Sequence, residues 1–333
     1  MTYPDFKLAI VGAGRWGFNH VRTAATLLDP DNIYVIDPDK NVKEKIASVN
    51  DKINCTNDID FVLNNDKLNS VIVATPAETH YKITKLLLES GKNVLVEKPI
   101  TLNLDEAHEL TKIAKAKNRK LMVGHVLFYH PAVRKMKEGI DKGEIGKLQY
   151  IYSNRLNLGS IRSEENILWS FAPHDVSVIQ YLTDSYPIEV FAKGADFVQN
   201  GIEDTTLTFL KYPDEIAAHI FVSWLHPFKE QRMIVVGEEG MYVFEDTLKT
   251  EKLKFYKKGF INKNGIIEKF ESEYKAVELE EKLPLTEEHL HFYDCVINDK
   301  EPLTDGNHAY DVLKILVEAT NSLKEKSISA KTE

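Results

Sequence analysis

The sequence predicts an α/β protein in which a doubly wound parallel sheet is followed by a second domain rich in antiparallel strands. Three observations support this prediction. Short apolar runs alternate with amphipathic stretches as far as Gly124, a glycine-rich turn follows the first of these runs, and strand-like runs follow one another after Pro131. Alternating strands and helices are typical of a parallel sheet, whereas consecutive strands joined by short turns are typical of antiparallel pairing.

The first predicted domain, residues 1–124, contains the alternating pattern. The apolar runs that we expect to be strands are Lys7–Val11, Ile33–Ile36, Ser70–Ala74, Asn93–Val96 and Leu121–Gly124. The amphipathic stretches that we expect to be helices are Trp16–Leu28, Val42–Val49, His80–Glu89 and Leu104–Ala116. Because parallel strands are joined by right-handed crossovers, these helices should cover both faces of the sheet.

The second predicted domain, residues 125–333, has a different pattern of helices and strands. It opens with a helix over Ala132–Ile140 and closes with two helices that start after Thr286 and Asp305. The strands that we expect between them are Lys147–Asn157, Ile188–Phe197, Glu203–Tyr212, Glu215–Leu225, Gln231–Gly237 and Met241–Glu245. No low-complexity linker separates the two domains, so a cleft between them is the default ligand site.

The turn after the first apolar run has the spacing of a dinucleotide-binding loop. Gly12, Gly14 and Gly17 lie in the segment LAIVGAGRWG. The first glycine allows a tight turn off the strand, the second allows the backbone to approach a pyrophosphate, and the third allows the helix to pack close to the sheet. The helix that starts here directs free N–H groups and its positive dipole end at phosphate oxygens.

An acidic residue, Asp37, ends the next apolar run about 20 residues after the glycines. A carboxylate at this place accepts both ribose hydroxyls of NAD and repels the 2′-phosphate of NADP. No arginine follows directly, because the run continues Pro38, Asp39 and Lys40. We therefore expect NAD. A turn with a structural role alone is disfavoured, because strand, glycines, helix and spaced acid occur together.

Bulk composition excludes several classes of protein. The chain has 333 residues, of which 43% are apolar, so it can bury a sizeable core in two domains. A net charge of −9 and the lack of a basic cluster argue against nucleic acid or a membrane surface as a partner. The distant cysteines Cys55 and Cys295 predict neither disulfides nor a metal site. With no signal peptide or spanning segment, we expect a cytoplasmic protein.

Lys98 is the first candidate for chemistry. It follows the strand Asn93–Val96 in the sequence Glu97-Lys98-Pro99, and ligands bind at the carboxyl edge of parallel sheets. An ammonium there can hydrogen-bond a substrate oxygen, stabilise a developing alkoxide, or exchange a proton if its pKa is lowered. The alternative, a surface lysine at a strand end, is equally open from its position alone.

His174 is the second candidate. It precedes the predicted helical stretch Val176–Leu182, and a helix start lowers the pKa of a histidine, which suits a neutral base at pH 7. The alternative is a capping or packing role, the commoner one for any single histidine among the 11 in this chain. A preceding loop loaded with hydrogen-bonding groups favours the functional interpretation.

That loop, residues 154–162, carries two arginines and two asparagines. We expect Arg155, Asn157 and Arg162 to bind a phosphorylated sugar, because guanidinium groups bind phosphate in a bidentate manner. The alternative, that the arginines are solvated or paired with Glu164 and Glu165, is left open. The sequence has no Gly-x-Ser-x-Gly elbow and no Walker lysine, so hydrolase and kinase functions are disfavoured.

Several motifs occur in one order along nearly the whole chain. They are GAGRWG, Ala74-Thr75-Pro76 with His80, Glu97-Lys98-Pro99, His174 before a helix, and Pro302-Leu303-Thr304-Asp305-Gly306. As a set they resemble the Gfo/Idh/MocA oxidoreductase family. The resemblance implies a Rossmann domain with tightly held NAD(P). It also implies a C-terminal α/β domain whose large open-faced, mainly antiparallel sheet mediates homodimer or homotetramer assembly.

The resemblance also implies roles for individual residues. Lys98 and His174 are the implied catalytic pair. The implied cofactor contacts are Gly12, Gly14, Arg15, Trp16, Gly17, Asp37, Thr75, Pro76, His80, Glu97 and Lys98. The residues that we expect to contact the substrate are Tyr129 on the cleft wall, Arg155, Asn157, Arg162 and His174.

Within the family, NRLNLG, Arg162 and WSFAPHD resemble the subgroup that oxidises the 3-hydroxyl of UDP-N-acetylglucosamine-type sugars to a 3-keto sugar. The chain departs from the broader family at Ser170, Ala77, Leu127 and Phe128, where aspartate, asparagine and arginine are common. We therefore expect NAD-dependent oxidation of such a nucleotide sugar. The alternatives are reduction of a keto-sugar nucleotide, oxidation of a free polyol such as inositol, and an NAD-binding sensor without turnover.

Overall fold

The computed structural model describes residues 3, 5–39, 41–159, 161–163 and 165–325. The chain divides into two compact units. The first contains the residues up to Tyr129 together with Lys282–Leu313, and the second contains His130–Glu281 together with the residues after Leu313. The chain thus returns to the first unit late in the sequence. The functional division into residues 1–124 and 125–333 stays a prediction.

In the described residues, the first unit is built on a six-stranded parallel sheet with the order β3-β2-β1-β4-β5-β6. The strands are β1 (Leu8–Val11), β2 (Ile33–Ile36), β3 (Asn54–Thr56), β4 (Ser70–Val73), β5 (Asn93–Glu97) and β6 (Leu121–Gly124). Every residue of β1, β4, β5 and β6 is buried, as expected for parallel strands covered on both faces. The predicted parallel sheet is confirmed. Only β3 was missed, because three residues carry little periodic signal.

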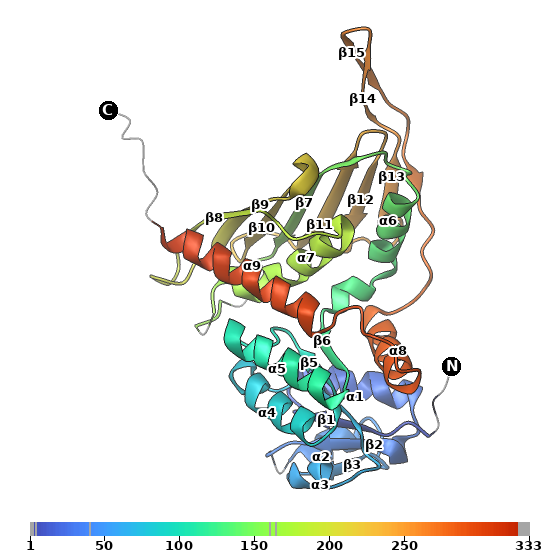
Figure 1. Ribbon diagram of the computed structural model, residues 1–333, viewed down its shortest axis with the longest axis vertical. Coiled ribbons are helices and arrows are strands. Elements are labelled where there is room, and N and C mark those ends of the chain that lie inside the picture. Colours follow the sequence, from blue (N-terminus) through green and yellow to red (C-terminus); the bar gives the residue numbers. More distant parts are fainter. Residues whose placement is uncertain (1–2, 4, 40, 160, 164, 326–333) are drawn as a thin grey trace. The chain divides into compact units, whose positions relative to one another are not determined.

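Helices cover both faces of this sheet (Figure 1). They are α1 (Arg15–Leu27), α2 (Val42–Ala47), α3 (Asp60–Leu63), α4 (Ala77–Glu89) and α5 (Leu104–Lys117). The chain moves from β1 to β2 through α1, and from β4 to β5 in the opposite direction through α4. Because both crossovers are right-handed, the two helices lie on opposite faces. The result is the predicted doubly wound fold.

The returning segment is attached along β6, at the edge of the sheet. The Thr304 carbonyl accepts the Val123 N–H at 2.8 Å, and the Thr304 hydroxyl donates to the Val123 carbonyl at 2.8 Å. These bonds anchor the loop between α8 (Pro284–Ile297) and α9 (Gly306–Lys324). Helix α8 begins at Pro284 rather than after Thr286, because the fixed φ of proline suits the first helical position.

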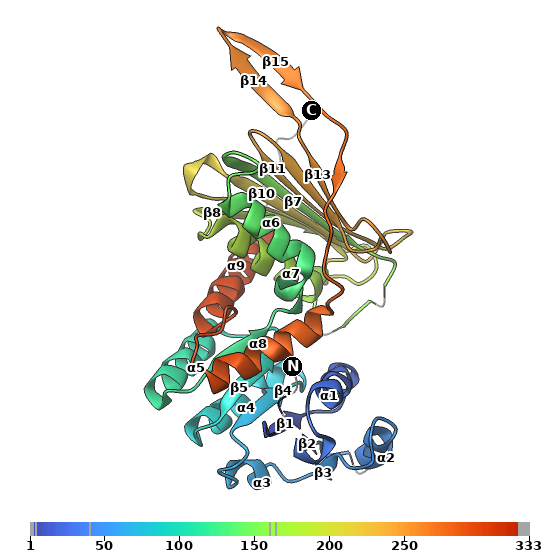
Figure 2. The same ribbon diagram turned by 90° about the vertical axis from the view of Figure 1, so that its right-hand side faces the viewer.

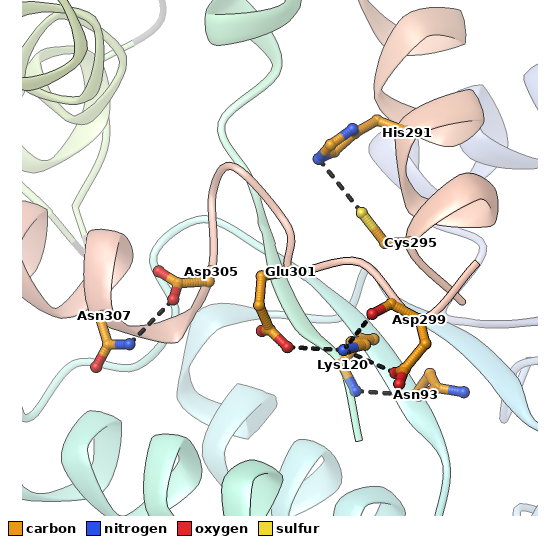
Figure 3. Close-up of polar contacts among 8 residues, drawn as sticks. All are labelled: Asn93, Lys120, His291, Cys295, Asp299, Glu301, Asp305 and Asn307. Carbon is orange, nitrogen blue, oxygen red and sulfur yellow. Dashed lines mark hydrogen bonds and ion pairs between the residues drawn. The ribbon is translucent and has the colours of Figure 1, made fainter. Parts of the chain in front are cut away.

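A buried lysine provides a second attachment (Figure 3). The Lys120 ammonium lies 3.0 Å from an Asp299 carboxylate oxygen and 2.7 Å from one of Glu301, and its side chain is only 7% exposed. The Lys120 N–H donates to the Asn93 side chain at 3.0 Å, which links the starts of β5 and β6. Because a buried ammonium needs charged partners, this pair of carboxylates holds the returning segment in place.

In the described residues, the second unit contains an eight-stranded sheet with the order β16-β13-β12-β11-β7-β10-β9-β8. The strands are β7 (Leu148–Leu156), β8 (Glu189–Ala195), β9 (Thr205–Lys211), β10 (Ala217–Ser223), β11 (Glu230–Gly237), β12 (Met241–Glu245), β13 (Leu253–Tyr256) and β16 (Lys275–Ala276). Strands β7 and β10 run parallel, and the other neighbouring pairs are antiparallel. The predicted mainly antiparallel sheet is confirmed.

The two faces of this sheet differ in what covers them. Helices α6 (Pro131–Asp141) and α7 (Ile167–Thr183) lie over one face (Figure 2). Side chains alternate along each strand, so Ile220 and Val222 of β10 are buried. On β9 the alternate residues Leu207 and Phe209 are exposed. The second face is therefore open and carries apolar side chains, which agrees with the open-faced sheet that the resemblance implies.

Helix α7 begins at Ile167, which corrects the predicted start near Val176. Asn166 caps the helix by accepting the Trp169 N–H at 3.3 Å. Pro173 lies inside the helix, although proline disfavours a helix interior. Most α7 side chains are buried, which stabilises the helix across the proline. His174 therefore lies in a helix interior, where the dipole effect of a helix start does not apply.

A hairpin of β14 (Gly259–Lys263) and β15 (Ile266–Phe270) forms a small separate sheet of the second unit (Figure 2). Its turn residues Asn264 and Gly265 have φ values of 56° and 89°, as a type I′ turn requires. Among the helices of the described residues, none has the length and apolar character that a bilayer crossing needs.

Candidate active site

The candidate site begins at the glycine loop between β1 and α1. Gly12 has a φ of +92°, which L side chains rarely adopt, and a Cβ there would lie 2.6 Å from the Ala74 carbonyl oxygen. A Cβ on Gly17 would overlap the carbonyl group of Gly12. Both glycines are therefore required by the fold itself, because they let α1 pack directly against the loop.

Gly14 has a different role. Apart from Gly14 itself and the adjoining backbone, no heavy atom of the described residues lies within 4 Å of a Cβ built at Gly14, and its φ of −61° suits any residue. Gly14 is also the N-cap of α1, and no described side chain caps this helix. The first N–H groups of α1 and the positive end of its dipole are thus left for another partner. A pyrophosphate fits this place, because it accepts such N–H groups at close approach.

Asp37 lies beside the glycine loop, at the carboxyl end of β2. Its Oδ2 accepts the Ala13 N–H at 2.6 Å, and the Lys45 ammonium donates to the Ala13 carbonyl at 2.7 Å. These bonds hold the carboxylate next to the place where a dinucleotide would bind on α1. Arg15 and Trp16 are exposed at the start of α1, so their side chains are available to a ligand there.

The loops after β4 and β5 form the next part of the same sheet edge. Thr75 and Pro76 follow β4, and Lys98 and Pro99 follow β5. His80, buried on α4, joins the loops: Nε2 lies 2.9 Å from the Thr75 carbonyl oxygen and Nδ1 lies 2.7 Å from that of Pro99. The Lys98–Pro99 peptide bond is cis. His80 thus orders both loops through their backbones, and its own contact with a cofactor stays a prediction.

Glu97 points into the first unit. Its side chain is 11% exposed, and its Oε1 lies 2.8 Å from Nε2 of the buried His20 of α1. Its Oε2 accepts the N–H of Lys98 at 3.2 Å. The carboxylate therefore bonds both α1 and the lysine backbone. The half-buried Lys98 lies at the carboxyl edge of the sheet, and the cofactor contacts of both residues stay predictions.

His174 belongs to the second unit, and the residue after it ties its helix to the sheet. Asp175 is buried on α7 and accepts from Arg155 Nε at 2.7 Å and from the Ser153 hydroxyl at 2.6 Å. Arg155 Nη2 also donates to Asp175, at 3.1 Å. The guanidinium of Arg155 is thus paired with a carboxylate next to His174. Because Lys98 lies in the first unit, the meeting of Lys98 and His174 at one substrate stays a prediction.

The other predicted substrate residues lie in different surroundings. Arg162 pairs with Glu165 at 2.6 Å and stays 53% exposed, as the alternative interpretation of this loop expects, while Glu164 lies outside the described residues. Asn157 directly follows β7 and is half-buried. Tyr129 of the first unit is buried, and its hydroxyl lies 3.0 Å from the Thr304 hydroxyl. Direct contacts of these residues with a substrate stay predictions.

Sequence reasoning missed three residues that organise the site. His20 bonds Glu97, Lys45 bonds the glycine loop, and Asp175 bonds Arg155. Lys45 carries no local signal, because a lysine on an amphipathic helix usually faces water. His20 and Asp175 do carry a local signal. His20 lies one turn after Gly17 on the buried face of α1, and Asp175 directly follows His174.

Comparison with known proteins agrees with this geometry. The sequence model described as "Oxidoreductase family, NAD-binding Rossmann fold", of the Gfo/Idh/MocA type, matches residues 6–125. The model described as "GFO/IDH/MocA C-terminal domain" matches residues 133–243. The two matches together span well over half of the chain and coincide with the parallel sheet and with much of the antiparallel sheet.

Two relatives and one solved structure illustrate the similarity. A scyllo-inositol 2-dehydrogenase (NAD(+)) of Bacillus subtilis is 28% identical over 96% of this chain and 94% of its own length. A UDP-N-acetylglucosamine 3-dehydrogenase of Acidithiobacillus ferrooxidans is 25% identical over 60% of this chain and 61% of its own length. The structure of the Acidithiobacillus enzyme GnnA covers 95% of this chain and 97% of its own with a TM-score of 0.80 at 21% identity, which shows the shared fold.

The glycines provide a first test of the cofactor site. We expect Gly14→Ala to bind NAD at least tenfold more weakly, because the methyl group enters the space left for the pyrophosphate. Its free energy of unfolding should fall by only about 1 kcal/mol or less. Gly17→Ala should lose about 1–3 kcal/mol of stability from the clash with Gly12. Isothermal calorimetry with NAD and urea unfolding measure the two effects, and normal NAD binding by Gly14→Ala would contradict the assignment.

Asp37 provides a test of cofactor choice. We expect Asp37→Ala to lower NAD affinity about tenfold or more relative to NADP affinity, because the carboxylate accepts ribose hydroxyls and repels a 2′-phosphate. Asp39→Ala, which removes the same charge from a nearby exposed position, is the matched control and should leave the ratio unchanged. Fluorescence titrations with both coenzymes give the ratio. An unchanged ratio in Asp37→Ala would place the ribose elsewhere.

Proposed function

The chain belongs to the Gfo/Idh/MocA family of NAD-dependent oxidoreductases, and from that premise we propose that it oxidises the 3-hydroxyl of a UDP-N-acetylglucosamine-type nucleotide sugar to a 3-keto sugar. One observation carries the choice of substrate. The segments that resemble the nucleotide-sugar subgroup, the end of β7 and the His174 region of α7, are joined by the buried pair of Arg155 and Asp175. They therefore form a single fixed surface in the second unit.

The proposed chemistry assigns one task to each of two side chains. NAD, when bound, accepts the hydride from carbon 3 of the sugar. The His174 imidazole takes the proton of the 3-hydroxyl, so that the C–H and O–H bonds break and a carbonyl forms. The Lys98 ammonium donates a hydrogen bond to the same oxygen and stabilises its developing negative charge. The fold contributes by positioning these groups.

The two arginines, Arg155 at the end of β7 and Arg162 in the segment that follows it, differ in how easily a ligand can recruit them. The Arg162–Glu165 pair is exposed, and exposed ion pairs contribute only about 0–1 kcal/mol, so a sugar diphosphate can displace Glu165. Arg155 is 12% exposed and its partner Asp175 is 1% exposed, and breaking a buried pair costs about 3–5 kcal/mol. We therefore propose Arg162, with Asn157, as a diphosphate ligand, and Arg155 as the residue that supports α7 beneath it.

A second candidate function is oxidation of a free polyol such as inositol. The observation in its favour is the extent of the match to the Bacillus subtilis scyllo-inositol 2-dehydrogenase, which spans 96% of this chain. Against it stands Ser170, which lies one helical turn before His174 where the broader family commonly carries an aspartate. A polyol would leave Arg162 with Glu165, because it has no phosphate to compete for the guanidinium.

We also propose that the chain assembles into a homodimer or homotetramer through the open face of the eight-stranded sheet. Phe191 of β8 pairs in register with Phe209 of β9, and Phe209 pairs with His219 of β10. Phe191 is 52% exposed, and the neighbouring Leu207 is 48% exposed. A continuous apolar surface of this kind is typical of a protein interface.

Substrate oxidation tests the proposed function. In the presence of NAD, we expect UDP-N-acetylglucosamine to produce NADH with a kcat/KM at least tenfold above that of scyllo-inositol. Lys98→Ala should bind NAD normally but lose about 10²–10⁴-fold in kcat, because the oxygen loses its charged donor. The control is Lys85→Ala, which removes a lysine of α4 that pairs with Glu109 of α5. Absorbance at the NADH band measures the rate of NADH formation for each substrate and variant. A preference for inositol would favour the second candidate.

Sedimentation tests the proposed assembly. We expect Phe209→Asp to convert the oligomer to the 38.0 kDa monomer, because a buried carboxylate at the centre of an apolar interface has no partner. Phe61→Asp, which changes an exposed phenylalanine on α3 of the first unit, is the control and should leave the oligomer intact. An unchanged sedimentation coefficient for Phe209→Asp would exclude this face as the interface.

A further inference from the structure

A chain of buried hydrogen bonds lies behind the predicted catalytic lysine. Glu97 Oε1 lies 2.8 Å from His20 Nε2, and His20 Nδ1 lies 2.8 Å from His289 Nε2. His289 Nδ1 lies 2.9 Å from the Tyr293 hydroxyl. His20, His289 and Tyr293 are fully buried, and they come from α1 and α8 of the first unit. The proposed chemistry does not use these residues, although the chain of hydrogen bonds ends at Glu97, the residue next to Lys98.

The chemistry of the four groups lets each contact of this hydrogen-bond chain join a donor to an acceptor. Burial and the neighbouring His20 hold the pKa of His289 well below its usual value, so that imidazole is neutral and has one N–H. Burial raises the pKa of Tyr293, so its hydroxyl keeps its proton. A carboxylate only accepts, so His20 donates to Glu97 through Nε2. A neutral His289 has one N–H and one lone pair on its two ring nitrogens, and these face His20 and Tyr293.

The far end of the chain fixes the backbone of the lysine. Glu97 Oε2 accepts the N–H of Lys98 at 3.2 Å, so the orientation of this carboxylate sets the start of the Lys98 loop. A second acid, Glu288, is fully buried on α8, and neither of its oxygens has a hydrogen-bond partner in the described residues. Burial and the negative charge of Glu97 raise the pKa of Glu288 well above its usual value. This shift favours the uncharged form of Glu288.

We propose that His20, His289 and Tyr293 are positioning residues, which form a buried hydrogen-bond chain that holds the Glu97 carboxylate in one orientation and thereby places Lys98 for catalysis. The proposal rests on the proposed role of Lys98. A catalytic group must be held by supporting contacts to within a fraction of an ångström, and a chain of buried imidazoles anchored on two helices provides such support. The proposal also explains why two histidines and a tyrosine are buried together.

The kinetic test interrupts the chain at its middle. We expect His289→Phe to bind NAD and substrate normally, with an unchanged KM, but to lose about tenfold or more in kcat, because Glu97 and the Lys98 loop lose their fixed orientation. His289→Gln should restore most of this loss, since its amide can donate to His20 and accept from Tyr293. An unchanged kcat in His289→Phe, or equal losses in the Phe and Gln variants, would overturn the positioning role.

The matched control lies two residues along the same helix. His291 Nε2 accepts the Leu303 N–H at 3.0 Å and lies 3.5 Å from the Cys295 sulfur (Figure 3). Because these bonds lead to the α8–α9 loop, His291→Phe should destabilise the first unit without lowering kcat. A kcat loss in His291→Phe equal to that in His289→Phe would attribute the effect to general destabilisation and overturn the proposal.

A second measurement on the wild-type protein is independent of turnover. In nitrogen-15 NMR spectra of histidine-labelled protein, we expect the His289 imidazole to be neutral between pH 6 and 8, with one ring nitrogen protonated and the other accepting a hydrogen bond. An imidazolium signal from His289, or a ring nitrogen without a hydrogen bond, would overturn the proposed chain. If the wild-type protein oxidises none of the substrates while these signals are as expected, the proposed function fails and the hydrogen-bond chain stands.

Discussion

The fold of the first unit depends on the close packing of Gly17 against the Gly12 carbonyl, which leaves no space for a side chain. This packing sets the position of α1 on the sheet. From that position the start of α1 presents uncapped N–H groups, the loop presents the Ala13 N–H to Asp37, and the buried face of α1 presents His20 to Glu97. One steric constraint thus organises the uncapped start of α1, the position of Asp37 and the contact of His20 with Glu97.

The first unit could be predicted largely from local sequence. Strand β2 and strand β6 have the predicted boundaries, because a buried parallel strand is a short apolar run with clear ends. The cofactor edge followed from the glycine spacing and Asp37. By contrast, the attachment of Thr304 to Val123 joins residues that are 181 positions apart, and no local pattern encodes such a partner. The same is true of His20 and His289, 269 positions apart, which is why the hydrogen-bond chain escaped prediction.

The second unit shows two other kinds of failure. The predicted start of α7 was too late. The helix continues through Pro173, because its tertiary burial outweighs the local cost of the proline. The hairpin of β14 and β15 was missed although Asn264-Gly265 is a strong turn signal, so that error was one of interpretation. The contact of Arg155 with a substrate stays a prediction, but its pairing with Asp175, 20 residues further along the chain, was not foreseen. Chemical type was predictable at these positions, whereas pairing was not.

The account rests on the claim that carbon 3 of a nucleotide sugar delivers its hydride to the nicotinamide of an NAD bound along the sheet edge that carries Gly14, Asp37 and Lys98. The most direct test uses UDP-N-acetylglucosamine carrying deuterium on carbon 3 of the sugar, with NAD and the wild-type protein. Proton NMR and mass spectrometry of the coenzyme should show one deuterium at carbon 4 of the nicotinamide and a 3-keto sugar as the second product. NADH without deuterium, or no NADH from this substrate, would contradict the account.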